Sequence, residues 1–108
     1  MPHDFQLYIN DIIHSCEKII RYTKNLSKEE FIKNEIIYDA VLRNLIIIGE
    51  AAKGLPESCR EEFKDVEWKK VCGLRDIITH AYFGIDNEIV WDIIQSKIPH
   101  LLSLLKGD

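Results

Sequence analysis

Glycine and proline are scarce in this sequence of 108 residues, which contains five glycines and three prolines. A sandwich or barrel of many short strands needs turn residues at each chain reversal, so this composition argues against an all-β fold. Hydrophobic residues make up 46% of the chain and charged residues 30%, the balance of a globular domain with a core. We therefore expect one all-α domain over residues 1–108.

Cysteine and long apolar runs are scarce as well. The three cysteines, Cys16, Cys59 and Cys72, are an odd number without a closely spaced pair, so neither a disulfide framework nor a Cys-x-x-Cys site is indicated. The longest strongly apolar run, residues 45–49, is far shorter than the roughly 20 residues that cross a bilayer. The first residues also lack the basic and apolar regions of a signal peptide. We expect a cytoplasmic protein with reduced thiols and no membrane span.

An excess of positive charge is also missing. Lys and Arg total 14 against 18 Asp and Glu, a formal net charge of −4. A strong sequence-independent grip on nucleic acid depends on neutralising many phosphates, so any action on RNA must rest on a local cluster. Five basic residues in the middle of the chain could form a rim toward RNA: Lys53, Arg60, Lys64, Lys69 and Lys70. Acidic residues alternate with them, which favours a solvated mixed-charge surface instead.

The first half of the chain shows helical patterns. Apolar residues recur at i, i+3 and i+4 over about residues 5–25, which predicts an amphipathic helix. Ser27 and Glu30 form an S-x-x-E capping box that predicts a second helical stretch over 28–53, with an interruption near Asn34. The later part of this stretch is apolar on several sides and must be covered on several sides, which favours a partner chain.

The second half predicts further helices. Pro56 suits the first turn of a short helix, and Asp65 is placed to cap a longer one over about 67–82. A last helix begins near residue 87, and we expect Pro99 to kink or restart it. Taken together, the helical patterns of both halves predict an up-and-down bundle of four to five helices.

The densest cluster of chemically capable side chains lies in the predicted 67–82 helix and consists of Arg75, Asp76, Thr79, His80 and Tyr82. Arg75 and His80 are five residues apart and diverge by about 140° on a regular helix, so an undistorted lone helix would not direct both at one atom, although the long arginine side chain can cover part of that angle. A second copy across a twofold axis could complete a shared cleft. Asp76 lies one turn before His80, where it can orient the imidazole ring.

The spacing Arg75-x4-His80-x-Tyr82 resembles the R-x4-H-x-Y signature of the HepT proteins in the HEPN ribonuclease superfamily. Other segments resemble the family's running pattern, in order, over most of the chain: Asp39-Ala40-Val41, Arg43-Asn44-Leu45, Ile48-Gly49-Glu50-Ala51, Trp68, Gly73-Leu74, Ile85-Asp86, Val90-Trp91 and Ile98-Pro99. The resemblance implies a HEPN-like bundle that forms a homodimer and acts as the toxin of a toxin-antitoxin pair. It further implies RNA cleavage without a metal or cofactor. The implied partner is an MntA-type minimal nucleotidyltransferase that transfers AMP to Tyr82.

The residue types suit this chemistry. A neutral imidazole, with an ordinary pKa of about 6.5, can take the proton of a ribose 2′-hydroxyl, which is the role we expect for His80. A guanidinium can hold two phosphate oxygens while negative charge builds up, which is the role we expect for Arg75. We expect Asp76 to assist, although an unpaired acid there would repel phosphate. An adenylate on Tyr82 would add negative charge beside Arg75 and block the phosphate site.

Other interpretations of the same residues remain open. Arg75 and Asp76 could form an ordinary surface ion pair, and Glu50 is a candidate buried polar group with an inter-helix hydrogen bond. His3, His14 and His100 have no companions at metal-ligand spacing, so we expect no metal site. The main alternative function is a non-catalytic dimeric adaptor that binds a nucleotidyltransferase, with or without a nucleotide. A third is a bundle that only dimerises.

Overall fold

The computed structural model of the protein describes residues 5–81 and 83–107, and every regular element over these residues is helical. The elements are α1 (Phe5–Thr23), α2 (Lys28–Lys33), α3 (Glu35–Lys53), α4 (Glu57–Glu61), α5 (Trp68–Cys72), α6 (Leu74–Thr79), α7 (Asn87–Asp92), the π-helix η2 (Ile93–Lys97) and α8 (Ile98–Lys106). The prediction of an all-α fold is confirmed. Within the described part of the chain, no helix has both the length and the apolar character that crossing a membrane requires.

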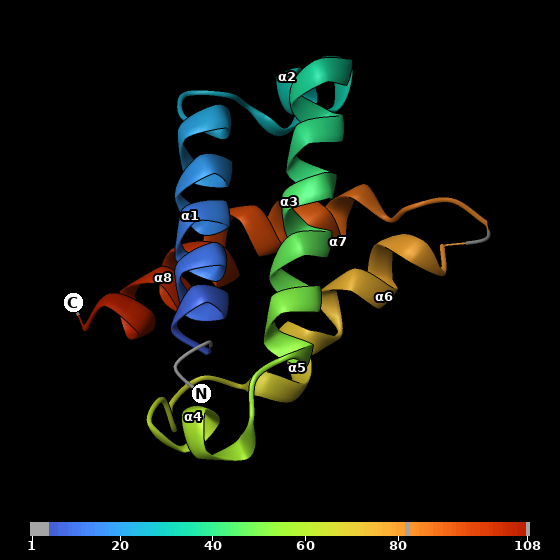
Figure 1. Cartoon of the computed structure of the whole chain (residues 1–108). Helices are drawn as coiled ribbons and strands as arrows, with labels where there is room; N and C mark the ends of the chain where they lie inside the picture. Colours follow the sequence, from blue (N-terminus) through green and yellow to red (C-terminus); the bar gives the residue numbers. More distant parts are fainter. Residues whose placement is uncertain (1–4, 82, 108) are drawn as a thin grey trace.

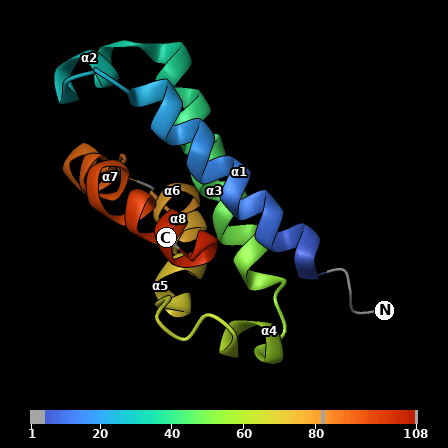
Figure 2. The ribbon, with the colours of Figure 1, turned by 90° about the vertical axis from the view of Figure 1, so that its left-hand side faces the viewer.

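The two long helices, α1 and α3, form an antiparallel pair that lies side by side over most of its length (Figure 1). The segment formed by α7, η2 and α8 lies on one side of this pair, with α8 packed on α1 (Figure 2). α5 and α6 pack on α3. The predicted helical bundle is therefore present. The described residues form more and shorter helices than the four to five expected, because the second half of the chain is divided into several short ones.

The turn between α2 and α3 follows the sequence prediction. Ser27 Oγ accepts a hydrogen bond from the Glu30 backbone N–H at 3.1 Å, and Glu30 Oε1 accepts one from the Ser27 N–H at 2.9 Å, so the capping box is formed. Asn34 ends α2 with an extended backbone, and its Oδ1 accepts from the Ile37 N–H at 3.0 Å to begin α3. The predicted interruption near Asn34 is confirmed.

The helix predicted over 67–82 is divided and shorter. It breaks at Gly73, which ends α5 and begins α6, and it stops after Thr79 because His80 leaves the helical conformation, with φ −106° and ψ 23°. The helix breaks here because glycine is a poor helix former. The two short helices on either side of Gly73 both pack on α3. Asp65 does not cap the segment, since α5 begins after Glu67 without a side-chain cap.

The predicted restart of the last helix at Pro99 is confirmed, because a new helix, α8, begins at Ile98. Before it the chain widens into the π-helical turn η2, in which the Ile98 N–H donates to the Ile93 carbonyl five residues earlier. Proline lacks an N–H and its ring clashes with the carbonyl four residues before it, and a wider turn relieves that clash. Pro99 then lies within the first turn of α8, where its missing N–H has no helical partner to lose.

The core fills the space between the long pair and the C-terminal segment. Its largest fully buried side chains come from α1, α2, α3, α7 and α8 and include Ile12, Ile19, Phe31, Leu45, Ile48, Val90 and Ile98. Phe31 stacks between Tyr38 and Trp91, with ring centroids 5.2 Å and 5.6 Å away. This aromatic contact joins α2, α3 and α7 at one end of the bundle.

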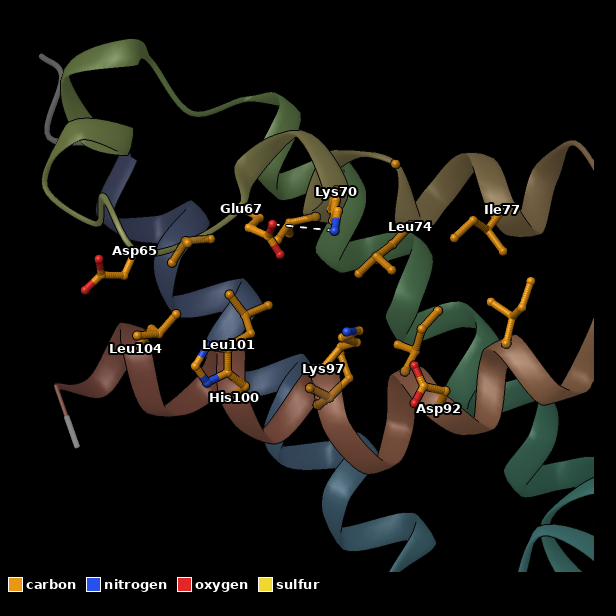
Figure 3. A pocket seen from close by; sticks show the side chains of 16 residues that line it. Asp65, Glu67, Lys70, Leu74, Ile77, Asp92, Lys97, His100, Leu101 and Leu104 are labelled. Carbon is orange, nitrogen blue, oxygen red and sulfur yellow. Dashed lines mark ion pairs between the residues drawn. The ribbon is translucent and has the colours of Figure 1, made fainter.

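An apolar groove of about 560 Å³ runs between the α5–α6 segment and the α7–η2–α8 segment (Figure 3). Leu74 and Ile77 line one wall, and Leu101 and Leu104 line the other. Charged side chains of both signs border it: Asp65, Glu67, Lys70, Asp92 and Lys97.

Candidate active site

The position of Arg75 depends on a close crossing of α6 over α3. Gly49 is buried at this crossing, and a Cβ atom placed on it would lie 2.7 Å from the Arg75 backbone nitrogen and 2.9 Å from Arg75 Cβ. Such distances are too short for any side chain, so the missing side chain of Gly49 is what lets α6 approach. The Ile48-Gly49-Glu50 segment thus places the arginine.

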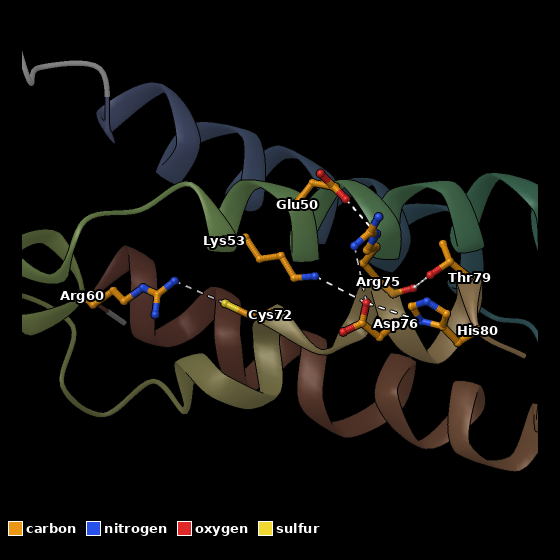
Figure 4. A network of polar contacts seen from close by, with 8 residues as sticks. All are labelled: Glu50, Lys53, Arg60, Cys72, Arg75, Asp76, Thr79 and His80. Atoms are coloured by element: carbon orange, nitrogen blue, oxygen red, sulfur yellow. Dashed lines mark hydrogen bonds and ion pairs between the residues drawn. The ribbon is translucent and has the colours of Figure 1, made fainter.

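The next residue on α3 fixes the direction of the guanidinium. Arg75 Nε lies 2.9 Å from Glu50 Oε2 and forms an ion pair with it, which holds the guanidinium beside α3 (Figure 4). The expected inter-helix contact of Glu50 is confirmed. The expectation that Glu50 is buried is wrong, because its side chain is 55% exposed and reaches Arg75 across the surface.

One carboxylate oxygen gathers the rest of the site. Asp76 Oδ1 lies 3.4 Å from Lys53 Nζ, 3.6 Å from Arg75 Nη1 and 3.7 Å from His80 Nδ1 (Figure 4). These groups come from the end of α3, the start of α6 and the residue that ends α6. Two of them are permanent cations and the third can become one. We call Glu50, Lys53, Arg75, Asp76 and His80 the polar cluster.

The expected divergence of Arg75 and His80 applies to an undistorted helix, and the segment that carries them is not one. The 140° divergence assumed a regular helix through both residues, whereas α6 ends at Thr79 and His80 has a non-helical backbone. The long arginine side chain covers the remaining angle. A single chain therefore brings both groups to Asp76 Oδ1.

The geometry around His80 assigns different surroundings to its two ring nitrogens. Nδ1 faces Asp76 at 3.7 Å, longer than a hydrogen bond but within ion-pair range once the imidazole is protonated. Nε2 lies at the opposite edge of a ring whose side chain is 56% exposed. A substrate can therefore reach His80 from solvent.

The sequence cluster contains two further polar residues, Thr79 and Tyr82. Thr79 Oγ1 donates to the Arg75 carbonyl at 3.0 Å, so its hydroxyl is bonded to the last turn of α6. Tyr82, the expected AMP acceptor, lies outside the described residues.

Lys53 is the member of the polar cluster that the sequence interpretation did not connect with Arg75 and His80, because a mixed-charge surface was favoured for it. Its neighbour Arg60 explains how the end of α3 is held: Arg60 Nη2 donates to the Ala52 carbonyl at 2.9 Å and lies 3.5 Å from Cys72 Sγ (Figure 4). The spacing Glu50-x-x-Lys53 places two opposite charges on one face of the helix end. That spacing was the available signal, but only the tertiary structure shows that both face α6.

The sequence was compared with known proteins. The family model described as Ribonuclease HepT-like matches residues 12–106, which include the whole polar cluster. The chain belongs to the HepT-like ribonuclease family. The resemblance to HEPN ribonucleases found in the Arg75-x4-His80-x-Tyr82 spacing is thereby confirmed.

Individual HepT-like relatives agree with this assignment. A "Probable ribonuclease HepT" of Thermococcus cleftensis is 34% identical over 101 residues, 94% of this chain and 92% of that protein. A "Putative RNase" of Caldanaerobacter subterraneus subsp. tengcongensis is 40% identical over 99 residues, 92% of this chain and 88% of that protein. In a "Gamma-glutamylcyclotransferase and putative RNase" of Methanocaldococcus jannaschii, the similarity (39% over 101 residues) covers 94% of this chain but 46% of that longer protein. No solved structure matches the chain.

Proposed function

We propose that this HepT-like protein is an endoribonuclease whose reaction takes place at the polar cluster. The observation that carries the proposal is the convergence of Arg75 Nη1 and His80 Nδ1 on one carboxylate oxygen, at 3.6 Å and 3.7 Å. A phosphate-binding cation and a proton acceptor thus lie side by side on a solvent-accessible surface. RNA cleavage by its own 2′-hydroxyl needs both groups at one linkage.

The proposed step uses the two groups together. His80 Nε2 takes the proton of a ribose 2′-hydroxyl while the 2′-oxygen forms a bond to the adjacent phosphorus. The bond from phosphorus to the 5′-oxygen breaks, and this leaving oxygen takes up a proton, so that the products are a 2′,3′-cyclic phosphate and a 5′-hydroxyl. Arg75 stabilises the charge on the phosphoryl oxygens. DNA lacks the attacking hydroxyl and should not be cleaved.

Asp76 has an auxiliary role in this proposal. Its carboxylate faces Nδ1 of His80, so it favours the tautomer that carries a proton on Nδ1 and leaves Nε2 basic. It also stabilises the imidazolium that forms when Nε2 takes its proton. Because Lys53 and Arg75 lie within 3.6 Å of the same oxygen, the acid is paired and repels a phosphate less than an isolated acid would.

Incubation with bulk cellular RNA in a chelator tests this function. The wild type should produce fragments with 2′,3′-cyclic phosphate ends, and Arg75→Ala and His80→Ala should each lower the rate by about 100-fold or more. Circular dichroism should show the same helix content for all three proteins. Cleavage by the wild type that both variants retain would overturn the assignment of the site, and no cleavage of any RNA would overturn the function.

We further propose that the protein is the toxin of a toxin-antitoxin pair and is inactivated by AMP transfer to Tyr82. Tyr82 follows His80 by two residues in the sequence, and an adenylate on its phenol would add a negative charge that competes with phosphate for Arg75. Mass spectrometry after incubation with the cognate nucleotidyltransferase and ATP should find AMP on Tyr82. An adenylate on a different residue, or none, would contradict the proposal.

A homodimer is proposed as the active form, with the second copy covering the apolar groove. In a twofold interface the same surface meets itself, so its charged border must carry both signs, as Asp92 and Lys97 illustrate here. Ile77 and Ile89 at this groove are 38% and 47% exposed, which is costly without a partner. Ile77 lies on α6, the helix that also carries Arg75 and Asp76, so such a dimer would bring the α6 helices of both copies to one interface.

The alternative of a non-catalytic adaptor has one observation in its favour. Glu50 and Asp76 already neutralise Arg75 and Lys53, as in a surface whose charges serve docking or stability. The adaptor predicts that the wild type and His80→Ala are equally harmless when expressed. The ribonuclease predicts toxicity of the wild type alone, with nucleotidyltransferase binding retained by both proteins.

A further inference from the structure

Lys53 takes part in the polar cluster although it belongs to a different helix from Arg75, Asp76 and His80. It is the last residue of α3, and its Nζ lies 3.4 Å from Asp76 Oδ1 on α6. Its side chain is 38% exposed, so a substrate can reach the ammonium group. Lys53 and His80 are 27 positions apart in the sequence and meet only in the folded chain.

A purely structural role at the helix end does not account for this placement. A lysine in the last turn of a helix can stabilise the exposed carbonyl groups there. In α3, however, Arg60 Nη2 donates to the Ala52 carbonyl, and the Gly54 N–H bonds to the carbonyls of Glu50, Ala51 and Ala52. The ammonium of Lys53 is directed across to Asp76 instead.

The charges of the cluster show what Lys53 contributes. Arg75 lies between two carboxylates, with Glu50 Oε2 2.9 Å from its Nε and Asp76 Oδ1 3.6 Å from its Nη1. Two carboxylates exceed the charge of one guanidinium, so these three residues alone carry a net charge of −1 and repel a phosphate. Lys53 brings the sum to zero before His80 is counted. This second cation therefore lowers the repulsion between the site and an RNA phosphate.

We propose that Lys53 is a substrate-binding residue of the ribonuclease, which contacts an RNA phosphate beside the linkage that is cleaved. In the free protein Asp76 holds the ammonium close to Arg75, and the phosphate takes the place of this carboxylate as the partner of both cations. This inference rests on the proposed function and adds a third side chain, from α3, to the two on the α6 segment.

The test compares Lys53→Gln and Lys53→Arg with Lys18→Gln, a matched control in which an exposed lysine of α1 loses the same charge. Cleavage of a short single-stranded RNA is measured at several salt concentrations. For Lys53→Gln we expect KM to rise by about tenfold, since one charge-assisted hydrogen bond to a phosphate strengthens binding by about that factor. We expect kcat to change less than twofold, because the contact is made in the ground state and in the transition state alike. The slope of log KM against log salt should fall by about 0.7, the value for one phosphate contact on a single strand.

The controls separate this inference from the function itself. Lys53→Arg should restore KM, and Lys18→Gln should match the wild type in KM, kcat and salt slope. If the wild type cleaves RNA and Lys53→Gln leaves KM and salt slope unchanged, the inference is wrong and the function stands. If kcat alone falls, Lys53 only holds Asp76 in place, which also overturns it. A wild type that cleaves no RNA overturns the proposed function.

Discussion

At the scale of single residues, Asp76 has opposite effects on binding and on chemistry. It holds Lys53, Arg75 and His80 around one oxygen, but its negative charge occupies the place that a phosphate needs. Asp76→Asn keeps the shape and removes the charge. We predict that KM falls by about threefold to tenfold, because a like charge is removed, and that kcat falls by about tenfold, because the imidazolium loses its partner.

Steady-state cleavage of a short RNA measures both parameters for Asp76→Asn. Asp11→Asn, which removes an exposed carboxylate of α1, is the matched control and should behave as the wild type. A rise in KM for Asp76→Asn would show that the carboxylate assists RNA binding, contrary to the role given to it here.

Cys16 makes stability sensitive to alkaline pH. Burial, with a smaller effect of the nearby Glu17 carboxylate, raises the pKa of its thiol from 9.0 to about 12. The unfolded chain loses this proton above pH 9 while the folded chain keeps it, so the free energy of unfolding decreases as pH rises from 9 toward 12. Between pH 8 and 10.5 we predict that the wild type loses about 2 kcal/mol more than Cys16→Ala.

Urea unfolding followed by circular dichroism at these two pH values checks the prediction for Cys16. The comparison is between the two pH-dependent losses, since Cys16→Ala also creates a small cavity that lowers stability equally at both pH values. Equal losses for the two proteins would contradict a buried, protonated thiol.

Some residues of the site could be predicted from the sequence and others could not. Arg75, Asp76 and His80 lie within six positions, so their spacing alone indicated a joint site. Lys53 and Gly49 acquire their roles only where α3 meets α6, and nothing near them in the sequence shows that contact. Their roles therefore required the tertiary structure.

At the scale of elements, the crossing of α3 and α6 connects the fold to the chemistry. In Gly49→Ala the added methyl group would meet the Arg75 backbone at 2.7 Å, so α6 must move away from α3. We predict a loss of about 1–3 kcal/mol in stability, as in other overpacked sites. RNA cleavage should fall by about tenfold or more because Arg75 moves with α6.

Gly73→Ala is the control for this prediction. Gly73 has an ordinary helical φ of −74°, and an added Cβ would meet its nearest atoms at 3.4 Å and 3.5 Å, which are normal contact distances. This variant should fold and cleave RNA like the wild type, as measured by thermal melting and RNA cleavage. If both alanine variants behave alike, the close crossing does not position Arg75.

The elements that could be predicted are those with local signals. The capping box of Ser27 and Glu30 specifies the start of α2 through its own two hydrogen bonds. The break at Gly73 and the π-turn before Pro99 had weaker signals, because a glycine or a proline can be accommodated in a helix in several ways. Packing on α3 and on the core decides between these ways.

At the scale of the whole molecule, the apolar groove is the surface where we expect two copies to meet. Ile77→Asp would place a charge in the centre of that interface, and we predict that it converts a dimer into a monomer, because burying an unpaired carboxylate is very unfavourable. Sedimentation equilibrium measures the mass. Leu7→Asp, at a residue of α1 that is 63% exposed, should remain dimeric. A monomeric wild type, or a dimeric Ile77→Asp, would contradict this interface.

The all-α class followed from composition, because a chain with so few glycines and prolines has too few turns for many strands. The arrangement of short helices over a long antiparallel pair could not be predicted from composition, because each short helix is positioned by contacts with residues distant in the sequence. The resemblance to the HepT family implied a helical bundle and the candidate site residues, but not the crossing at Gly49.

The crossing at Gly49 also has a consequence for heating. α6 has only six residues, and a helix of this length has no stability of its own in water, so it persists only while it is attached to α3. Detachment of α6 would carry the guanidinium away while the longer α1–α3 pair stays folded, as in the local opening that many proteins undergo below their melting temperature. Activity should therefore be lost on warming before the helical circular dichroism signal changes, and it should return on cooling.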